Sequence, residues 1–260
     1  MIEKSARFRV GILANVVSIF SAFCWIPLPR FVEFCLTRSL GDHSPAPHLA
    51  ALLSYMVWIL YGFVHPNSIL LITSNVTCSL IVLYHLLLFT ICSKSWNNVR
   101  RKVFALVILE IVFVGIVATT VLTLVHDTKL RSHIIGMIAM ICQLGTYAYP
   151  ISYMKLTITT RDLDHLNVLF ATLSILSTTF WATYACDPPD WYLIVPNVVG
   201  CFLAVMELCL EGSPCGSYSH KSIARNLEFS RTASSPNGSC DVEVQSPISG
   251  TAGNSDNMKN

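Results

Sequence analysis

Seven apolar segments, each close to the length that crosses a lipid bilayer, dominate this chain. They cover about residues 10–28, 46–63, 68–92, 103–126, 133–155, 166–186 and 190–210. About 20 consecutive apolar residues are needed for an α-helix to span the hydrocarbon core. Charged residues make up only 12% of the chain, whereas about a quarter is usual in globular domains. The sequence therefore predicts an all-α membrane protein with seven transmembrane helices.

The first three apolar segments and the last three carry the same order of landmarks. Each group contains a proline, then a Trp-x-x-Tyr pair 31 residues later, then an asparagine. In the first group these residues are Pro27, Trp58, Tyr61 and Asn75, and in the second they are Pro150, Trp181, Tyr184 and Asn197. Paired segments with matching interruptions are typical of transporters whose binding site lies between two repeats.

The segment at residues 103–126 has neither a Trp-x-x-Tyr pair nor a proline and is predicted to be a linker helix. An odd helix between two groups of three makes both repeats cross the membrane in the same direction, so we expect two parallel three-helix repeats in a 3+1+3 arrangement. The expected parts are an extracytosolic N-terminus at 1–9, a first repeat at 10–92, a linker helix with flanking loops at 93–132, a second repeat at 133–210 and a disordered cytosolic tail at 211–260. The tail is rich in Ser, Gly, Asn and Pro, which favours disorder.

The distribution of Lys and Arg predicts the orientation. The loops after the first, third and fifth helices hold eight basic residues: Arg30, Arg38, Lys94, Arg100, Arg101, Lys102, Lys155 and Arg161. The opposite side holds five: Lys4, Arg7, Arg9, Lys129 and Arg131. Because cytosolic loops carry the excess of basic residues, we expect the N-terminus outside and the C-terminus in the cytosol.

Two polar pairs inside the apolar segments are candidates for a binding site. Asn75 and Asn197 lie at matching positions, and a carboxamide offers both donors and an acceptor to hydroxyl groups. The alternative is a structural amide that bonds a neighbouring helix. Trp58 and Trp181 offer flat faces to the C–H face of a sugar ring, and their alternative is the aromatic belt at a membrane interface.

Prolines in or beside the helices are candidate hinges. Pro27, Pro47 and Pro150 each lack an N–H and weaken their helix locally, near its predicted cytosolic end. Tyr61 and Asp190 both lie near the predicted outer side, where a phenol–carboxylate hydrogen bond could close a gate. Their spacing alone favours two unrelated interfacial residues.

Several of these stretches resemble the SWEET family of sugar transporters, over about residues 10–210. They are Pro27-Leu28-Pro29-Arg30-Phe31, Leu70-Leu71-Ile72-Thr73-Ser74-Asn75, Leu130-Arg131-Ser132-His133-Ile134-Ile135-Gly136 and Tyr192-Leu193-Ile194-Val195-Pro196-Asn197-Val198-Val199-Gly200. The resemblance implies a bidirectional facilitator, a uniporter for mono- or disaccharides that works by alternating access. It implies that Asn75, Asn197, Trp58 and Trp181 bind the sugar. Tyr61, Tyr184 and Asp190 then match the outer gate, and Pro27, Pro47 and Pro150 match three of four hinge prolines.

The chain departs from the family pattern at three places. The fourth hinge proline is replaced by Asn167, the spacing from Asn15 to Pro27 is two residues longer, and the bulky Tyr149 precedes Pro150 where small residues are usual. Tyr147 and Tyr149 either narrow the pocket or face a neighbouring helix. The length and the charged tail resemble the plant members of the family.

Partners and location follow from the same interpretation. We expect a sugar substrate, membrane lipids, and a homo-oligomer or a hetero-oligomer with related transporters. We favour the plasma membrane, with the vacuolar and Golgi membranes as alternatives. A net charge of +2 without a basic stripe argues against a nucleic-acid partner.

Four other functions are weighed against sugar transport. The absence of a nucleophile–base set, a phosphate loop or a metal-ligand cluster in the sequence argues against an enzyme, a metal site or a cofactor. A proton-coupled exporter of the PQ-loop type would have a Pro-Gln pair, and none of the three hinge prolines is followed by Gln. A seven-helix receptor would not repeat its helices. A transport-inactive relative that acts through oligomerisation is the remaining alternative, because of Asn167 and the longer first helix.

Overall fold

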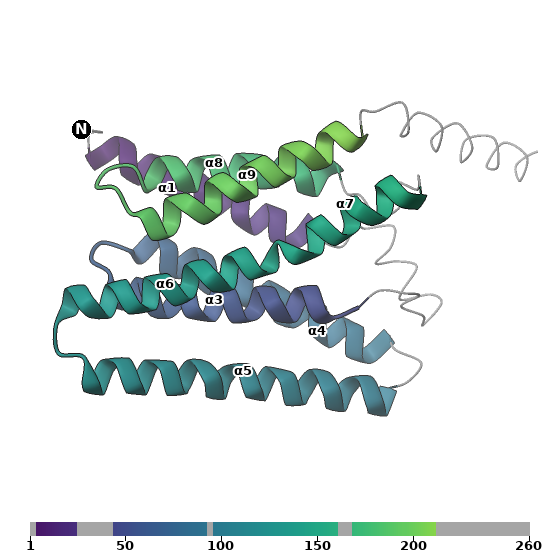
Figure 1. Ribbon diagram of the computed structural model, residues 1–260, viewed down its shortest axis with the longest axis horizontal. Coiled ribbons are helices and arrows are strands. Elements are labelled where there is room, and N and C mark those ends of the chain that lie inside the picture. Colours follow the sequence, from purple (N-terminus) through teal and green to yellow (C-terminus); the bar gives the residue numbers. More distant parts are fainter. Residues whose placement is uncertain (1–3, 25–43, 93–95, 161–167, 212–260) are drawn as a thin grey trace, which may run out of the picture. The chain divides into compact units, whose positions relative to one another are not determined.

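The computed structural model describes residues 4–24, 44–92, 96–160 and 168–211, which all lie in one compact unit, Met1–Ser219. The described residues form eight α-helical segments (Figure 1). These are α1 (Lys4–Cys24), α3 (Ala46–Val64), α4 (Ile69–Cys92), α5 (Trp96–Leu124), α6 (Thr128–Thr146), α7 (Ala148–Thr160), α8 (Val168–Tyr184) and α9 (Trp191–Glu211). Pro27, Asn167 and all but the first residue of the tail predicted at 211–260 lie outside the described residues, and that first residue, Glu211, ends α9.

α6 and α7 are two halves of one membrane span. Pro150 has no N–H to donate to the carbonyl of Thr146, four residues earlier, so the helical ladder is interrupted there. The chain instead makes a tight turn in which the N–H of Tyr147 donates to the carbonyl of Leu144 at 3.1 Å. Together the two halves give a candidate span of 32 residues, Thr128–Thr159.

Within the described ranges, six candidate spans are long and apolar enough to cross a membrane, and α8 is a shorter apolar helix. The prediction of seven transmembrane helices in an all-α membrane protein is therefore confirmed. The helix ends differ from the apolar segments, because hydropathy marks the hydrocarbon core and helices continue past it. α1 already begins at Lys4, within the predicted N-terminal segment, and α5 begins at Trp96 rather than near 103.

The two repeats pack through a reciprocal contact. The first helix of each repeat lies against the second helix of the other, so α1 contacts α8 and α6 contacts α3. Within each repeat the third helix packs on the first two, with α4 against α1 and α3, and α9 against α6–α7 and α8. The same packing in both halves is what two structurally equivalent repeats produce.

The direction of the repeats is fixed by contacts among helix ends. Side-chain hydrogen bonds join the beginnings of α1, α6 and α9 to the ends of α3 and α8. The first helix of each repeat therefore starts at the same end of the bundle, and Figure 1 shows α1 and α6 both beginning at the end where the N-terminus is marked. The repeats are parallel, which confirms the predicted 3+1+3 arrangement.

α5 lies outside this packing and contacts α3, α4 and α6. Only 6% of its most apolar stretch is buried in the bundle, and large side chains such as Phe104 and Leu109 are exposed along it. An apolar helix that is exposed on most of its surface is typical of a membrane span that contacts lipid. The fold is thus that of a multi-pass integral membrane protein.

Candidate functional site

The two repeat-matched asparagines are both buried in the bundle. Asn75 is 8% exposed and Asn197 is 4% exposed. In each, Nδ2 donates 2.7 Å to the carbonyl four residues earlier, of Leu71 and Leu193 respectively. Each amide uses one donor within its own helix, and its Oδ1 makes no hydrogen bond within the described residues. The structural alternative, an amide that bonds a neighbouring helix, is not what these contacts show.

The two repeat-matched tryptophans also occupy equivalent surroundings. Trp58 is 2% exposed and Trp181 is 6% exposed, so neither lies in an exposed aromatic belt. Trp58 meets the ring of Tyr61 edge-on at 5.4 Å and 85°, and Trp181 meets Tyr184 at 5.5 Å and 85°. All four rings belong to one buried cluster, together with the leucines whose carbonyls hold the asparagines. The amides and indoles of both repeats therefore border the same part of the core.

The two indole N–H groups differ. Nε1 of Trp181 donates 2.9 Å to Oγ of Ser18, which in turn lies 2.7 Å from Oγ of Ser177. Nε1 of Trp58 is buried and has no hydrogen-bond partner among the described residues. A buried N–H without a partner costs free energy, and it is available to a hydroxyl group of a bound molecule.

At the opposite end from the hinges, Tyr61 and Asp190 are brought together. The hydroxyl of Tyr61, near the end of α3, donates 2.9 Å to Oδ2 of Asp190, just before α9. The other carboxylate oxygen of Asp190 accepts from the backbone N–H of Tyr192 at 3.1 Å. The bond therefore joins the first repeat to the second across 129 residues of sequence.

His65 extends this contact between Tyr61 and Asp190, which is called the outer contact below after the side on which the sequence predicts it to lie. Its Nδ1 lies 3.1 Å from the hydroxyl of Tyr61 and 3.0 Å from Oγ of Ser132, at the beginning of α6. Its Nε2 is 4.0 Å from Oδ2 of Asp190. Burial lowers the pKa of His65 below its usual 6.5 and the nearby Arg7 lowers it further, while Asp190 acts in the opposite direction. The neutral imidazole is therefore the form that this contact favours.

Tyr184 makes a separate contact between the repeats. Its hydroxyl donates 3.1 Å to the carbonyl of Asn67, in the turn between α3 and α4. Nε of Arg7 donates 3.1 Å to the carbonyl of Tyr184, and the guanidinium carbon lies 4.3 Å from the centre of its ring. Tyr61 and Tyr184 are thus equivalent by sequence but bond different partners, a carboxylate and a backbone carbonyl.

The hinge candidates lie where the sequence places them, as far as they are described. Pro47 is in the first turn of α3, where an N–H would have no helical partner in any case, so it removes no hydrogen bond. Pro150 lies in the first turn of α7, just after the break at Tyr147. Of the four positions, these two are within the described ranges.

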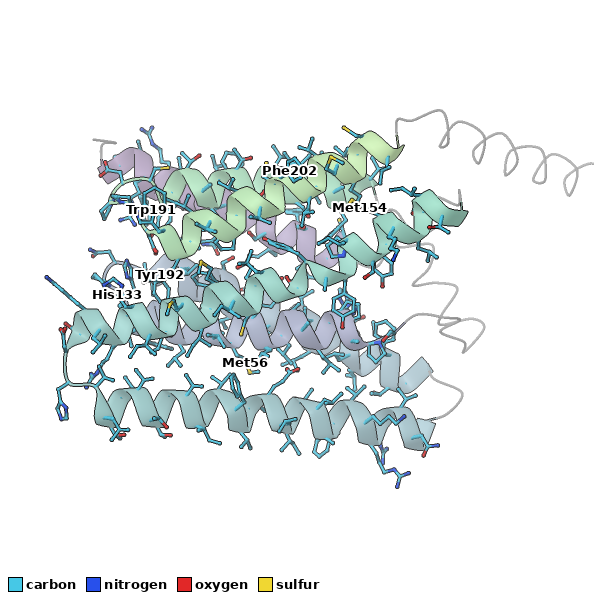
Figure 2. All side chains as sticks on the ribbon, viewed as in Figure 1. Met56, His133, Met154, Trp191, Tyr192 and Phe202 are labelled. Atoms are coloured by element: carbon cyan, nitrogen blue, oxygen red, sulfur yellow. The ribbon has the colours of Figure 1, made fainter. Side chains whose placement is uncertain are left out.

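Sequence reasoning missed several residues of the outer contact, among them His65, Ser132 and Arg7. His133 and Tyr192 also meet there, with Nδ1 of His133 2.8 Å from the Tyr192 hydroxyl (Figure 2). These residues lie in connecting turns or at helix ends and have no repeat-matched partner of the same type. Ser132, His133 and Tyr192 lie within the stretches Leu130–Gly136 and Tyr192–Gly200, which was their sequence signal, whereas His65 and Arg7 lie outside them.

Comparison with known proteins gives consistent results. A model of the family described as sugar efflux transporters for intercellular exchange matches residues 8–97 and 133–210, which correspond to the two repeats. The chain is 32% identical to bidirectional sugar transporter SWEET5 of Arabidopsis thaliana over 208 residues, 79% of this chain and 85% of the relative. It is 34% identical to bidirectional sugar transporter SWEET4 of Oryza sativa subsp. japonica over 206 residues, 78% of each chain. Its fold is similar to the solved structure of a eukaryotic SWEET transporter, with a TM-score of 0.71, 22% identity, and coverage of 79% of this chain and 95% of that one.

Proposed function

This chain belongs to the SWEET family of sugar transporters, and on that basis we propose that it is a bidirectional facilitator of mono- or disaccharides that works by alternating access. The observation that carries the proposal is the pair of buried amides and indoles at matching positions of two parallel repeats. Such a set combines hydroxyl-binding groups with apolar ring faces, as a sugar requires. The relatives that are named bidirectional sugar transporters support the same class of substrate.

In this proposal the sugar is held by Asn75, Asn197, Trp58 and Trp181. The Oδ1 atoms of the amides accept from sugar hydroxyls, because one N–H of each amide is already used within its own helix. The N–H of Trp58 donates to a sugar oxygen, and binding supplies the partner that this buried group lacks. Trp181 contributes its face alone, since its N–H is occupied by Ser18.

The outer contact acts as the outer gate. Tyr61 and Asp190 close this end through a hydrogen bond between repeats, and Tyr184 closes it a second time through Asn67. Bending near Pro27, Pro47, Pro150 and Asn167 opens and closes the other end. Rocking of the two repeats then exposes the sugar to one side at a time.

The surroundings of the protein are part of the proposal. We place it in the plasma membrane, with the N-terminus outside and the C-terminus in the cytosol. Two repeats that contact each other reciprocally form a complete path in one chain, so an oligomer of this chain or with related transporters would serve regulation rather than completing the site.

The test is uptake of radiolabelled glucose and sucrose by cells that lack their own hexose carriers. We expect saturable uptake by the wild type and its loss in Asn197→Ala. The matched control is Asn98→Ala, which removes an exposed amide at the start of α5. Surface expression is verified for each variant.

Two results would contradict the proposal. Undiminished uptake by Asn197→Ala would remove this amide from the site. No uptake of either sugar by wild-type protein at the cell surface would instead favour a transport-inactive relative that acts through oligomerisation.

A further inference from the structure

A hydrogen bond ties the break between α6 and α7 to the helix that carries Asn197. Tyr147, the single residue between the two halves, donates from its hydroxyl to the carbonyl of Pro196 in α9 at 2.7 Å. Pro196 is fully buried. Gln143, one turn earlier in α6, donates from Nε2 to the same hydroxyl at 3.5 Å. The phenol thus lies between the end of α6 and the middle of α9.

A glycine in α9 makes this approach possible. A Cβ atom on Gly200 would lie 3.0 Å from Cζ of Tyr147 and would overlap its hydroxyl oxygen. Gly200 follows Pro196 by four residues, so both lie on one face of α9. The ring of Tyr147 therefore rests directly on the backbone of α9 at the turn that contains Pro196 and Asn197.

This turn also sets the direction of the Asn197 side chain. Asn197 directly follows Pro196, and its Nδ2 donates to the carbonyl of Leu193 within the same helix. The amide is therefore fixed relative to the α9 backbone rather than to a neighbouring helix. Any rotation or shift of this turn moves the amide with it.

The equivalent positions of the first repeat hold different residue types. The repeat spacing places Cys24 opposite Tyr147, Ser74 opposite Pro196 and Cys78 opposite Gly200. The thiol of Cys78 donates weakly to the carbonyl of Ser18 in α1, at 3.8 Å. The position matched to Gly200 thus holds a thiol that contacts α1, whereas Gly200 itself leaves room for the ring of Tyr147.

We propose that Tyr147 is a positioning residue that couples bending of the α6–α7 span to the orientation of Asn197. The inference rests on the proposed function, because it assigns a means by which the hinge and the sugar site of the second repeat change together. When the span bends at Pro150, the hydroxyl of Tyr147 carries the Pro196 carbonyl with it, and the amide of Asn197 turns. A sugar that fixes Asn197 favours one bend of the span in return.

The variant that tests this is Tyr147→Phe, which keeps the ring on Gly200 and removes only the hydroxyl. Full-length protein in lipid nanodiscs is titrated with radiolabelled glucose and sucrose. Loss of one hydrogen bond is expected to raise the Kd by about fivefold. The matched control is Tyr149→Phe, because the hydroxyl of Tyr149 makes no hydrogen bond within the described residues and lies beside the same break.

A second measurement separates coupling from a general loss of structure. Spin labels are placed at two exposed positions, Ile158 in α7 and Phe202 in α9, the latter labelled in Figure 2. Sugar should shift the distance between the labels in the wild type and in Tyr149→Phe. In Tyr147→Phe the shift should be lost although the melting temperature is close to that of the wild type. Gly200→Ala, which displaces the hydroxyl while retaining it, should give the same result.

The outcomes distinguish this inference from the proposed function. An unchanged Kd and an unchanged sugar-dependent shift in Tyr147→Phe would overturn the coupling and leave the transporter intact. Failure of the wild type to bind either sugar would overturn the proposed function, and the inference with it.

Discussion

At the scale of single residues, two side chains at matching positions of the repeats can make different contacts. Trp58 and Trp181 lie at matching positions, yet only Trp181 has a partner for its N–H. Tyr61 and Tyr184 likewise bond different partners. The two repeats therefore present unlike hydrogen-bonding groups to the core they share, which is what binding an asymmetric molecule such as a sugar requires.

His65 should make the outer contact sensitive to acid. Its pKa is lowered in the fold, chiefly by burial, so a state that exposes His65 takes up the proton more readily than the folded one. Stability from this group is therefore complete above the usual pKa of 6.5 and falls as the pH drops below it. We expect the melting temperature of the purified protein to fall between pH 7.5 and pH 5.5 by less in His65→Asn than in the wild type.

The control for this prediction is His133→Asn, which changes an exposed imidazole at the same end. It should retain the acid sensitivity of the wild type. Equal falls in melting temperature for wild type and His65→Asn would show that other titratable groups cause the acid sensitivity.

At the scale of helices, a glycine that lets two aromatic rings lie against the backbone of α6 decides where the outer contact forms. Gly136 in α6 lies against both Tyr61 and Tyr192, and a Cβ there would stand 2.9 Å and 2.8 Å from their rings. No larger residue fits without moving one ring. The hydrogen bond from Tyr61 to Asp190 depends on this absence of a side chain.

Gly136→Ala should therefore weaken the packing of α6 on α3 and α9. Overpacking of this kind costs about 1–3 kcal/mol, so the melting temperature should fall. The control is Gly115→Ala in α5, where a Cβ would meet nothing within 4 Å and Ala is the better helix former. Equal melting temperatures for Gly136→Ala and wild type would show that the rings move aside freely.

The linker helix α5 contains a buried carboxyl oxygen that lacks a hydrogen-bond partner among the described residues. Glu110 lies near the middle of the span Asn98–Leu124, and its Oε2 is buried with no hydrogen-bond partner among the described residues. Val107 and Val114, about one turn away on either side, pack against the bundle. Glu110 thus lies on the packed face of α5, where an acid is costly.

Glu110→Leu should consequently stabilise the protein, by about 1–3 kcal/mol if the buried oxygen alone is responsible. Thermal unfolding in detergent would detect this as a higher melting temperature. The control is Ile108→Leu, an exposed position of the same helix, which should change little. A lower melting temperature in Glu110→Leu would mean that the carboxyl group has a stabilising partner.

At the scale of the whole molecule, the reciprocal packing of α1 on α8 and α3 on α6 makes each repeat a partner of the other. The outer contact joins the repeats across this interface. Alternating access by rocking requires that it separate during each cycle.

A cross-link across the interface should therefore stop transport. His65→Cys with Ser132→Cys replaces two side chains whose atoms lie 3.0 Å apart on different repeats. Joined by a short bis-methanethiosulfonate, which forms a disulfide with each thiol, this pair should abolish sugar uptake, and a reductant that cleaves the disulfides should restore it. The control pair, His133→Cys with Tyr192→Cys, joins α6 to α9 within one repeat (Figure 2) and should leave uptake intact. Uptake that persists with the first pair fully cross-linked would exclude rocking at this end.

The number of spans, their grouping as 3+1+3 and the matching of Asn75 with Asn197 could all be predicted from the sequence. Hydropathy is summed along one segment, and a repeat is recognised by comparing two segments. Neither prediction requires information about which helices are in contact. The family resemblance added the functional class because it compares the same local stretches. Residues 8–97 and 133–210 carry that information in both repeats.

Which side chains are in contact could be read from the folded bundle but not from the sequence. Tyr61 and Asp190 are 129 residues apart, and spacing alone favoured no contact between them. Tyr147 had two alternatives from sequence, a narrowed pocket or a neighbouring helix, and its bond to Pro196 identifies the neighbour as α9. These contacts depend on the rotation of each helix about its axis and on its depth relative to its partners. Both are set by packing across the whole bundle, which no single segment encodes.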